Sequence, residues 1–141
     1  MIVVDTNVLS ELARHAPDAR VLRWFESQPD GALYTTAITH AEILFGLALL
    51  PRGVKRDLVE AAITRVFTGT YADRILPFDS AAAPEYARIC AARRAAGRPI
   101  SQMDAQIAAI TRARRARLAT RDVAGFEGFD IEIVNPFGTT A

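Results

Sequence analysis

Short apolar segments alternate along the chain with longer segments whose apolar positions recur at helical spacing. The short segments are mostly aliphatic or β-branched, which is typical of strands, and they are Ile2–Val4, Ala32–Thr35, Ile75–Phe78, Leu118–Thr120 and Ile131–Val134. Apolar residues three and four apart predict helices at Val8–Arg14, Ala19–Ser27, Ala37–Leu50, Val54–Thr68, Ala81–Ala96 and Gln102–Arg115. Because strands alternate with helices, the sequence predicts an α/β/α sandwich with a short, largely parallel central sheet.

The length and the hydrophobic content predict one domain that spans residues 1–141. Half of the 141 residues are hydrophobic, which is enough for a core of ordinary size. The longest aliphatic run, Ile43–Leu50, is far shorter than the roughly 18 to 20 residues that cross a membrane. The first predicted strand follows Met1 directly and leaves no room for a signal peptide, so we expect a cytoplasmic protein without membrane attachment. The terminal segment Gly138–Ala141 is expected to fray.

Arginine is unevenly distributed, although the net charge is only +1. Between Arg88 and Arg121 lie nine arginines and one acid, Asp104. Such a segment indicates an anionic partner, but solvated helix faces give the same pattern, and composition leaves both explanations open. A second basic group, which fits a solvated surface better than an RNA contact, consists of Arg52, Lys55 and Arg56.

Four carboxylates occupy positions that the predicted fold directs toward one edge of the sheet. Asp5 and Asp122 follow the first and fourth strands, and ligands of open α/β sheets bind beyond the carboxyl ends of the strands. The other two acids lie in stripes expected to face the core: Glu42 shares its helix face with Ile38, Phe45 and Leu49, and Asp104 shares its face with Ile107, Ala108 and Thr111. An unpaired carboxylate is costly to bury, so these acids need partners.

Two explanations compete for the four acids. Capping is the structural one, because Thr39–Glu42 and Ser101–Asp104 match the capping-box pattern and aspartate is common in turns after strands. Thr36 is the better start of the third helix, however, which would place Glu42 inside it. Metal binding explains all four acids together, because Mg²⁺ and Mn²⁺ prefer oxygen ligands and such sites hydrolyse phosphodiesters. The single cysteine, Cys90, excludes a cysteine-rich metal site.

At these positions the sequence resembles the PIN-domain nucleases, and among them the VapC- and FitB-like toxins of bacterial toxin–antitoxin modules. The segments that carry the resemblance are VVDTNVLSEL, TTAITHAEILFG, PISQMDAQIAA, LATRDVAGF and IEIVNPF. The resemblance implies catalytic, metal-ligating acids at Asp5, Glu42, Asp104 and Asp122. It also implies that the site is supported through hydrogen bonds by Thr6, Asn7 and Thr120.

The resemblance further implies a cytoplasmic endoribonuclease that depends on Mg²⁺ or Mn²⁺ and is silenced by a cognate antitoxin. An arginine-rich surface beside an acidic metal pocket suits RNA, because arginines attract the phosphates. Arg121 is the arginine expected nearest the substrate. The RNA that is cleaved, the number of metal ions and the identity of the antitoxin stay open. The alternatives are a non-catalytic RNA- or protein-binding module on the same fold and a Mg²⁺-dependent phosphatase, which would want a second acid where Asn7 stands.

Apolar residues in excess of one helix face predict interfaces. In the third predicted helix these residues lie around more than one face, and they are Leu44, Phe45, Leu47, Leu49 and Leu50. In the second predicted helix, Trp24 and Phe25 are adjacent and cannot both point inward. The resemblance implies a homodimer and a groove for an antitoxin segment, whose Arg or Lys would replace the charge of the metal. The alternative is a monomer in which the following helix covers these residues.

Overall fold

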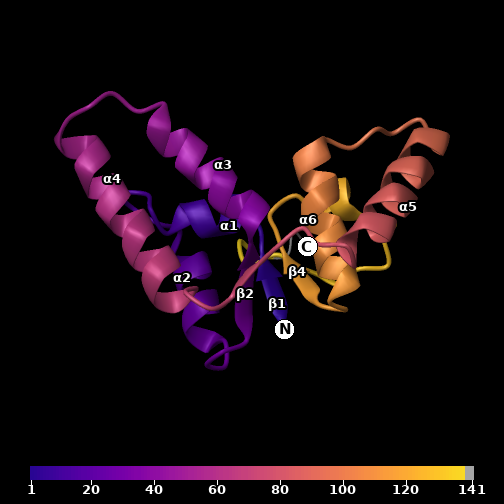
Figure 1. Cartoon of the computed structure of the whole chain (residues 1–141). Helices are drawn as coiled ribbons and strands as arrows, with labels where there is room; N and C mark the ends of the chain where they lie inside the picture. Colours follow the sequence, from indigo (N-terminus) through magenta and orange to yellow (C-terminus); the bar gives the residue numbers. More distant parts are fainter. Residues whose placement is uncertain (139–141) are drawn as a thin grey trace.

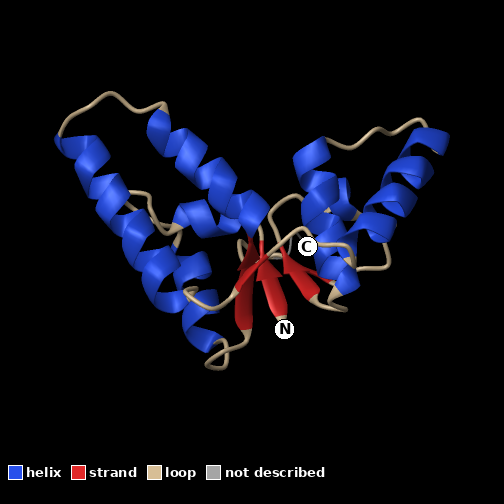
Figure 2. Cartoon of the chain, in the orientation of Figure 1, coloured by secondary structure: helices blue, strands red, loops and turns tan. Residues whose placement is uncertain are grey.

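The five strands form one parallel sheet with the N-terminal strand at its centre. The computed structural model describes residues 1–138, so the end of the segment expected to fray lies outside the described residues. The strands run in the order β3, β2, β1, β4, β5 (Figure 1). Their bounds are β1 Ile2–Val4, β2 Leu33–Thr36, β3 Ile75–Leu76, β4 Arg117–Ala119 and β5 Ile133–Val134. Every neighbouring pair is parallel, which confirms the predicted α/β fold, and all arrowheads point to the same edge in Figure 2.

Helices connect the strands and cover both faces of the sheet. Their bounds are α1 Thr6–Glu11, α2 Ala19–Ser27, α3 Ala37–Ala48, α4 Val54–Arg65, α5 Ala82–Ala95 and α6 Gln102–Ala113. A π-helix, η1 (Val66–Thr70), extends α4, and a 3₁₀ helix, η2 (Ala124–Phe126), follows β4. Helix α1 begins two residues before the predicted start because Asp5 caps it through the amide of Thr6. None of the helices among residues 1–138 has the length and apolar character needed to cross a membrane.

Alternation along β1 divides the core between the two faces of the sheet. Val3 belongs to the cluster formed with α5 and α6, whereas Ile2 and Val4 belong to the cluster formed with α1 to α4. Figure 1 shows α3 and α4 as one wing of the molecule and α5 and α6 as the other, with the sheet between them. The central strand is therefore buried on both faces, and its carboxyl end opens toward the site described below.

The outer half of α3 does not follow the predicted core stripe. Phe45 is 65% exposed and Leu49 is 68% exposed, and Leu47 is buried instead, so the stripe prediction is wrong for these two residues. Helix α3 extends beyond the sheet, where its neighbours are α1 and α4, and these lie against the face that carries Leu47. Helix α3 and its end thus expose more apolar surface than one core-facing stripe would leave, as predicted. The exposed residues include Phe45 and Leu49, which were expected in the core. The aromatic pair in α2 is half-buried, with Trp24 and Phe25 in edge-to-face contact.

Four of the nine arginines of the arginine-rich segment pair with acids outside it. Arg88 and Arg112 pair with Glu85, Arg114 pairs with Asp79, and Arg117 pairs with Glu132. Arg93 is buried, and its guanidinium lies 4.5 Å from the centre of the Phe129 ring. The concentration of positive charge in the sequence is therefore partly offset in space by acids before α5, in α5 and before β5, namely Asp79, Glu85 and Glu132.

Candidate functional site

Asp5 is a buried carboxylate at the carboxyl end of the central strand. The residue is 4% exposed, and its oxygens accept hydrogen bonds from the amide of Thr6 (2.8 Å) and the hydroxyl of Thr120 (2.7 Å). Burial raises the pKa of Asp5 to about 6 despite these hydrogen bonds, and the charges of Asp104 and Glu42 add to the rise. The fold therefore brings Glu42 and Asp104 within electrostatic reach of Asp5, and we call these three acids the Asp5 cluster.

Thr120 joins the ends of two neighbouring strands. It follows β4, which pairs with β1 through Val4 and Ala119, and its hydroxyl donates to Asp5 while it accepts from the amide of Asp122 (3.1 Å). Asn7 extends this network: its amide nitrogen lies 3.3 Å from both Asp5 Oδ2 and Thr120 Oγ1. The hydrogen bonds hold the two strand ends together and orient the carboxylate of Asp5.

Glu42 lies in the second turn of α3 and is held by Thr6. Helix α3 begins at Thr36, whose hydroxyl accepts from the amide of Thr39, so Glu42 belongs to the helix interior and not to a capping box. The hydroxyl of Thr6 donates to Glu42 Oε1 at 2.9 Å and stands 3.0 Å from the hydroxyl of Thr39. These contacts orient Glu42, which also lies at the edge of a groove between α1, α3 and α4.

Asp104 lies in the first turn of α6. Ser101 caps this helix and accepts a hydrogen bond from the amide of Asp104 at 3.2 Å, as the capping explanation predicts. The same carboxylate contributes to the raised pKa of Asp5, so Asp104 belongs to the Asp5 cluster as well. Capping and clustering are therefore compatible here, because the backbone amide of Asp104 serves the cap while the charge of its carboxylate acts on Asp5.

Asp122 occupies a different environment from the other three acids. It is exposed, and its Oδ1 accepts a hydrogen bond from the amide of Gly125 at 3.0 Å. The charges that raise the pKa of Asp5 come from Asp104 and Glu42, and Asp122 is linked to Asp5 through the hydroxyl of Thr120. The structure thus places Asp122 beside the cluster, with its carboxylate turned into the loop that leads to η2.

Arg121 has its backbone at the site and its side chain on an aromatic ring. Its amide donates to Asn7 Oδ1 at 3.1 Å, and its guanidinium carbon lies 4.6 Å from the centre of the Phe137 ring.

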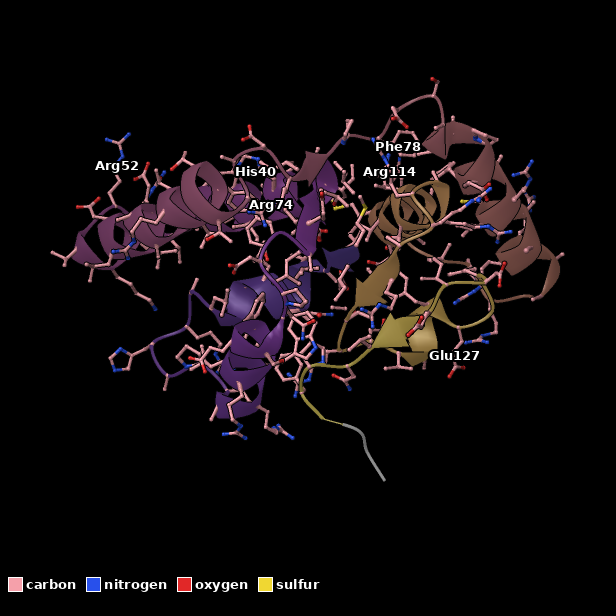
Figure 3. The ribbon with its side chains drawn as sticks, turned by 90° about the horizontal axis from the view of Figure 1, so that it is seen from below. His40, Arg52, Arg74, Phe78, Arg114 and Glu127 are labelled. Carbon is pink, nitrogen blue, oxygen red and sulfur yellow. The ribbon has the colours of Figure 1, made fainter. Side chains whose placement is uncertain are left out.

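His40 also stacks on an aromatic ring: the centre of its imidazole lies 4.0 Å from the centre of the Phe67 ring. Figure 3 shows His40 in the wing of α3 and α4 and Arg52 at the outer end of that wing.

The Asp5 cluster offers oxygen ligands but not a closed cage. Within residues 1–138, no three His, Cys, Asp or Glu side chains stand together in a way that could hold a metal ion. Magnesium does not require such a cage, since it keeps several waters and is held by one or two carboxylates. The cluster fits a hydrated cation of this kind, because its donors are oxygen atoms and a positive charge would offset the burial and the acids that raise the pKa of Asp5.

Sequence reasoning missed two residues that hold the loop of Asp122. Arg93, buried on α5, donates hydrogen bonds to the carbonyl oxygens of Gly125 and Arg98. Gly125 lies so close to Asp122 that a Cβ atom at this glycine would stand 2.2 Å from Asp122 Oδ2. The segment AGFEG signalled only a turn, and nothing in the sequence shows that an arginine thirty-two residues earlier would contact it.

Known proteins resemble this chain in sequence and in fold over almost its whole length. The family model "PIN domain" matches residues 2–130. VapC ribonuclease Y4jK from Sinorhizobium fredii is 41% identical over 97% of this chain and 98% of its own length. Toxin FitB from Neisseria gonorrhoeae is 37% identical over 97% of this chain and 99% of its own length. The crystal structure of FitAcB from Neisseria gonorrhoeae superposes with a TM-score of 0.88 at 37% identity, and covers 99% of this chain and 100% of that chain.

Proposed function

The chain belongs to the PIN-domain family, and on that premise we propose that it is a Mg²⁺- or Mn²⁺-dependent endoribonuclease. It would act in the cytoplasm as the toxin of a toxin–antitoxin module. The observation that carries the proposal is the Asp5 cluster, in which a buried carboxylate with a raised pKa lies near Glu42 and Asp104. Relatives named as a ribonuclease and as a toxin support the same function.

The residues of the chain divide the work of such a site. Asp5 and Asp104, with Glu42, would hold the cation, and Asp122 would join them from the edge of the site. When bound, the cation activates water and stabilises charge on the phosphodiester oxygens. Thr6 donates a hydrogen bond to Glu42, and Thr120 donates one to Asp5. Both carboxylates are therefore oriented before substrate arrives. Asn7 fixes the loop that carries Arg121, the residue that we assign to the RNA backbone.

RNA is the proposed substrate because phosphates are attracted to arginines that acids do not neutralise. Arg121 forms none of the ion pairs among the described residues, although its charge also acts on Asp18, whereas Arg88, Arg112, Arg114 and Arg117 are each paired with an acid. The phosphatase alternative has no support in the geometry, because Asn7 serves as a hydrogen-bond donor and acceptor between the strand ends. A non-catalytic module on the same fold is the alternative that the first experiment separates.

The direct test is cleavage of a structured RNA by purified protein with Mn²⁺ and with EDTA. We expect cleavage with Mn²⁺, none with EDTA, and loss of cleavage in Asp5→Ala and Asp104→Ala. The exposed Asp73 provides a matched control, because Asp73→Ala also removes one carboxylate but lies away from the site. Equal cleavage by all variants would assign the activity to a contaminant and refute the proposal.

A second test places the activity in cells. Expression of the wild-type chain is expected to stop growth and to create new RNA ends that sequencing can map, and Asp5→Ala is expected to do neither. Ends that appear equally with the variant would contradict nuclease toxicity. The mapped ends would also identify the RNA.

The exposed face of α3 supports a homodimer. Leu44, Phe45 and Leu49 are 43%, 65% and 68% exposed, and contiguous apolar surface of this kind marks interfaces. A two-fold contact would pair this face with its own copy. Light scattering over micromolar concentrations tests the dimer, and a monomer throughout that range would refute it.

The groove beside Glu42 supports an antitoxin partner. It has a volume of about 270 Å³, is lined mainly by apolar residues of α1, α3 and α4, and begins at Thr6 and Glu42. A bound antitoxin segment would bury its apolar side chains there, and an Arg or Lys could reach the Asp5 cluster in place of the cation. We expect the product of a small neighbouring gene to co-purify with the protein and to inhibit cleavage in competition with Mn²⁺. If no neighbouring product binds or inhibits, the toxin assignment fails while the nuclease assignment can stand.

A further inference from the structure

The groove between α1, α3 and α4 adjoins a second hollow at its far end. Ala13 and Val59 line both. The second hollow has a volume of about 380 Å³, and its other lining residues are His15, Val54, Lys55 and Leu58. We call it the Lys55 hollow. A ligand that fills the groove therefore meets an adjoining surface at the start of α4, beyond the part that the proposed function uses.

The two ends of this combined surface carry opposite charge. The near end presents Glu42, whose charge acts on the carboxylate of Asp5. The far end presents Lys55, the only lysine of the chain, together with the imidazole of His15. A ligand of one charge throughout would be favoured at one end and opposed at the other.

Other charged groups near the far end have their own partners or point elsewhere. Arg14 forms an ion pair with Glu11 at 3.3 Å, and Arg56 donates to the carbonyl of Leu50 at 3.2 Å. The nearest acid on the same helix is Asp57, two residues after Lys55, and it projects more than a third of a turn away around α4. Lys55 is thus the cation that faces a ligand in the Lys55 hollow.

The far end also exposes apolar side chains that a ligand could cover. Val54 is 76% exposed and Leu58 is 67% exposed. They lie one helical turn apart on the face of α4 that lines the hollow, with Lys55 next to Val54. Apolar side chains around a single cation favour a partner segment that combines apolar residues with a carboxylate.

We propose that the groove and the Lys55 hollow together recognise a charge order in a helical antitoxin segment. The segment places a basic side chain at the Asp5 cluster, apolar side chains along the groove and an acidic side chain against Lys55. Lys55 is then a residue by which this chain distinguishes its own antitoxin from others. The groove extends from Glu42 in α3 to Leu50, just past the end of that helix, so a segment that follows it on to Lys55 needs about three helical turns, or about 16 Å. The identity of the partner rests on the proposed function, but the charge order rests on the surface itself.

The test uses a phage-displayed library of 15-residue helical peptides, selected on the full-length protein and on Lys55→Glu. Arg52→Glu is the matched control, because it makes the same charge change at an exposed position that lines neither hollow. Peptides selected on the wild type and on Arg52→Glu should carry an acidic residue about three turns from a basic one. Peptides selected on Lys55→Glu should carry a basic residue in that place.

Affinities of the selected peptides give the size of the effect. Fluorescence anisotropy at low salt should show about a fivefold preference of the wild type for the acidic peptide over its Gln counterpart, the size expected of one exposed ion pair. Equal preference in wild type and Lys55→Glu would overturn the inference, and so would a loss of RNA binding in Lys55→Glu that Arg52→Glu does not show. A protein that shows the charge order but cleaves no RNA would refute the nuclease proposal and leave this inference standing.

Discussion

Replacing Asp5 with asparagine is expected to stabilise the metal-free protein at neutral pH while abolishing cleavage. The carboxylate is 4% exposed and lies near Glu42 and Asp104, so its negative charge destabilises the folded state. Asparagine has nearly the same shape and no charge. The variant therefore separates the electrostatic cost of the site from its packing.

The raised pKa of Asp5 gives the size of this effect. A rise from 3.8 to about 6 corresponds to about 3 kcal/mol of unfolding free energy. Because folded Asp5 holds its proton to higher pH than unfolded Asp5, the unfolding free energy of the wild type should fall by this amount as the pH rises from about 4 to above 6. Asparagine retains one oxygen acceptor for the donors Thr6 and Thr120, and the lost hydrogen bond costs about 1 kcal/mol. We therefore expect the variant to be about 2 kcal/mol more stable than the wild type at pH 7.

Urea unfolding in EDTA between pH 4 and pH 8 measures the difference between the two proteins. The exposed Asp73 gives a control, since Asp73→Asn should leave the pH dependence of the wild type unchanged. Saturating Mn²⁺ should raise the stability of the wild type above pH 6 and have a much smaller effect on Asp5→Asn, because ligand that binds only the folded state adds to its stability. Parallel pH profiles for the wild type and Asp5→Asn would refute the reasoning.

Three further predictions concern the loop of Asp122, the network of Thr120 and the exposed face of α3. In Gly125→Ala, the new Cβ would stand 2.2 Å from Asp122 Oδ2, so we expect the carboxylate to rotate away and the cleavage rate to fall about tenfold with little change in melting temperature; an unchanged rate would show that the position of Asp122 is unimportant. Thr120→Val removes a hydrogen bond that lowers the pKa of Asp5, so the fall in stability should move to higher pH in the same urea assay, and an unmoved profile would contradict the network. Phe45→Glu places a charge at a position that is 65% exposed in the proposed dimer face. Light scattering should report a monomer where the wild type is a dimer, and urea unfolding should stay cooperative; a dimer in the variant would contradict this face.

The sequence predicted the order of strands and helices well because each short apolar segment overlaps a strand, and the central one is buried on both faces. Boundaries were less accurate where one residue serves two elements. Asp5 ends β1 and also caps α1, so the helical spacing begins before the first apolar helix position. The π-helix at Val66–Thr70 leaves no signature in residue periodicity, and the fourth predicted helix accordingly continues into it as far as Thr68.

Tertiary contacts explain what the sequence could not show about the site. Periodicity identified a face of α3 but not how far the neighbouring elements extend, so Phe45 was placed in the core although it is exposed. Four acids were expected to act as equals, whereas the loop after β4 turns Asp122 toward Gly125. The arginines were read against the acids of their own segment, and the partners Asp79 and Glu132 lie outside it.

The pairing of β1 with β4 determines how late in synthesis the candidate site can be completed. Asp5 and Thr120, which hydrogen-bond across these strands, are 115 residues apart in the chain. Translation at about 5 to 20 residues per second would place roughly 6 to 23 seconds between the two residues. Until Thr120 and the strand before it have emerged from the ribosome, the central strand lacks one of its two neighbours and the carboxylate lacks its orienting hydroxyl. The Asp5 cluster therefore gains its full hydrogen-bond network only when nearly the whole chain has been made.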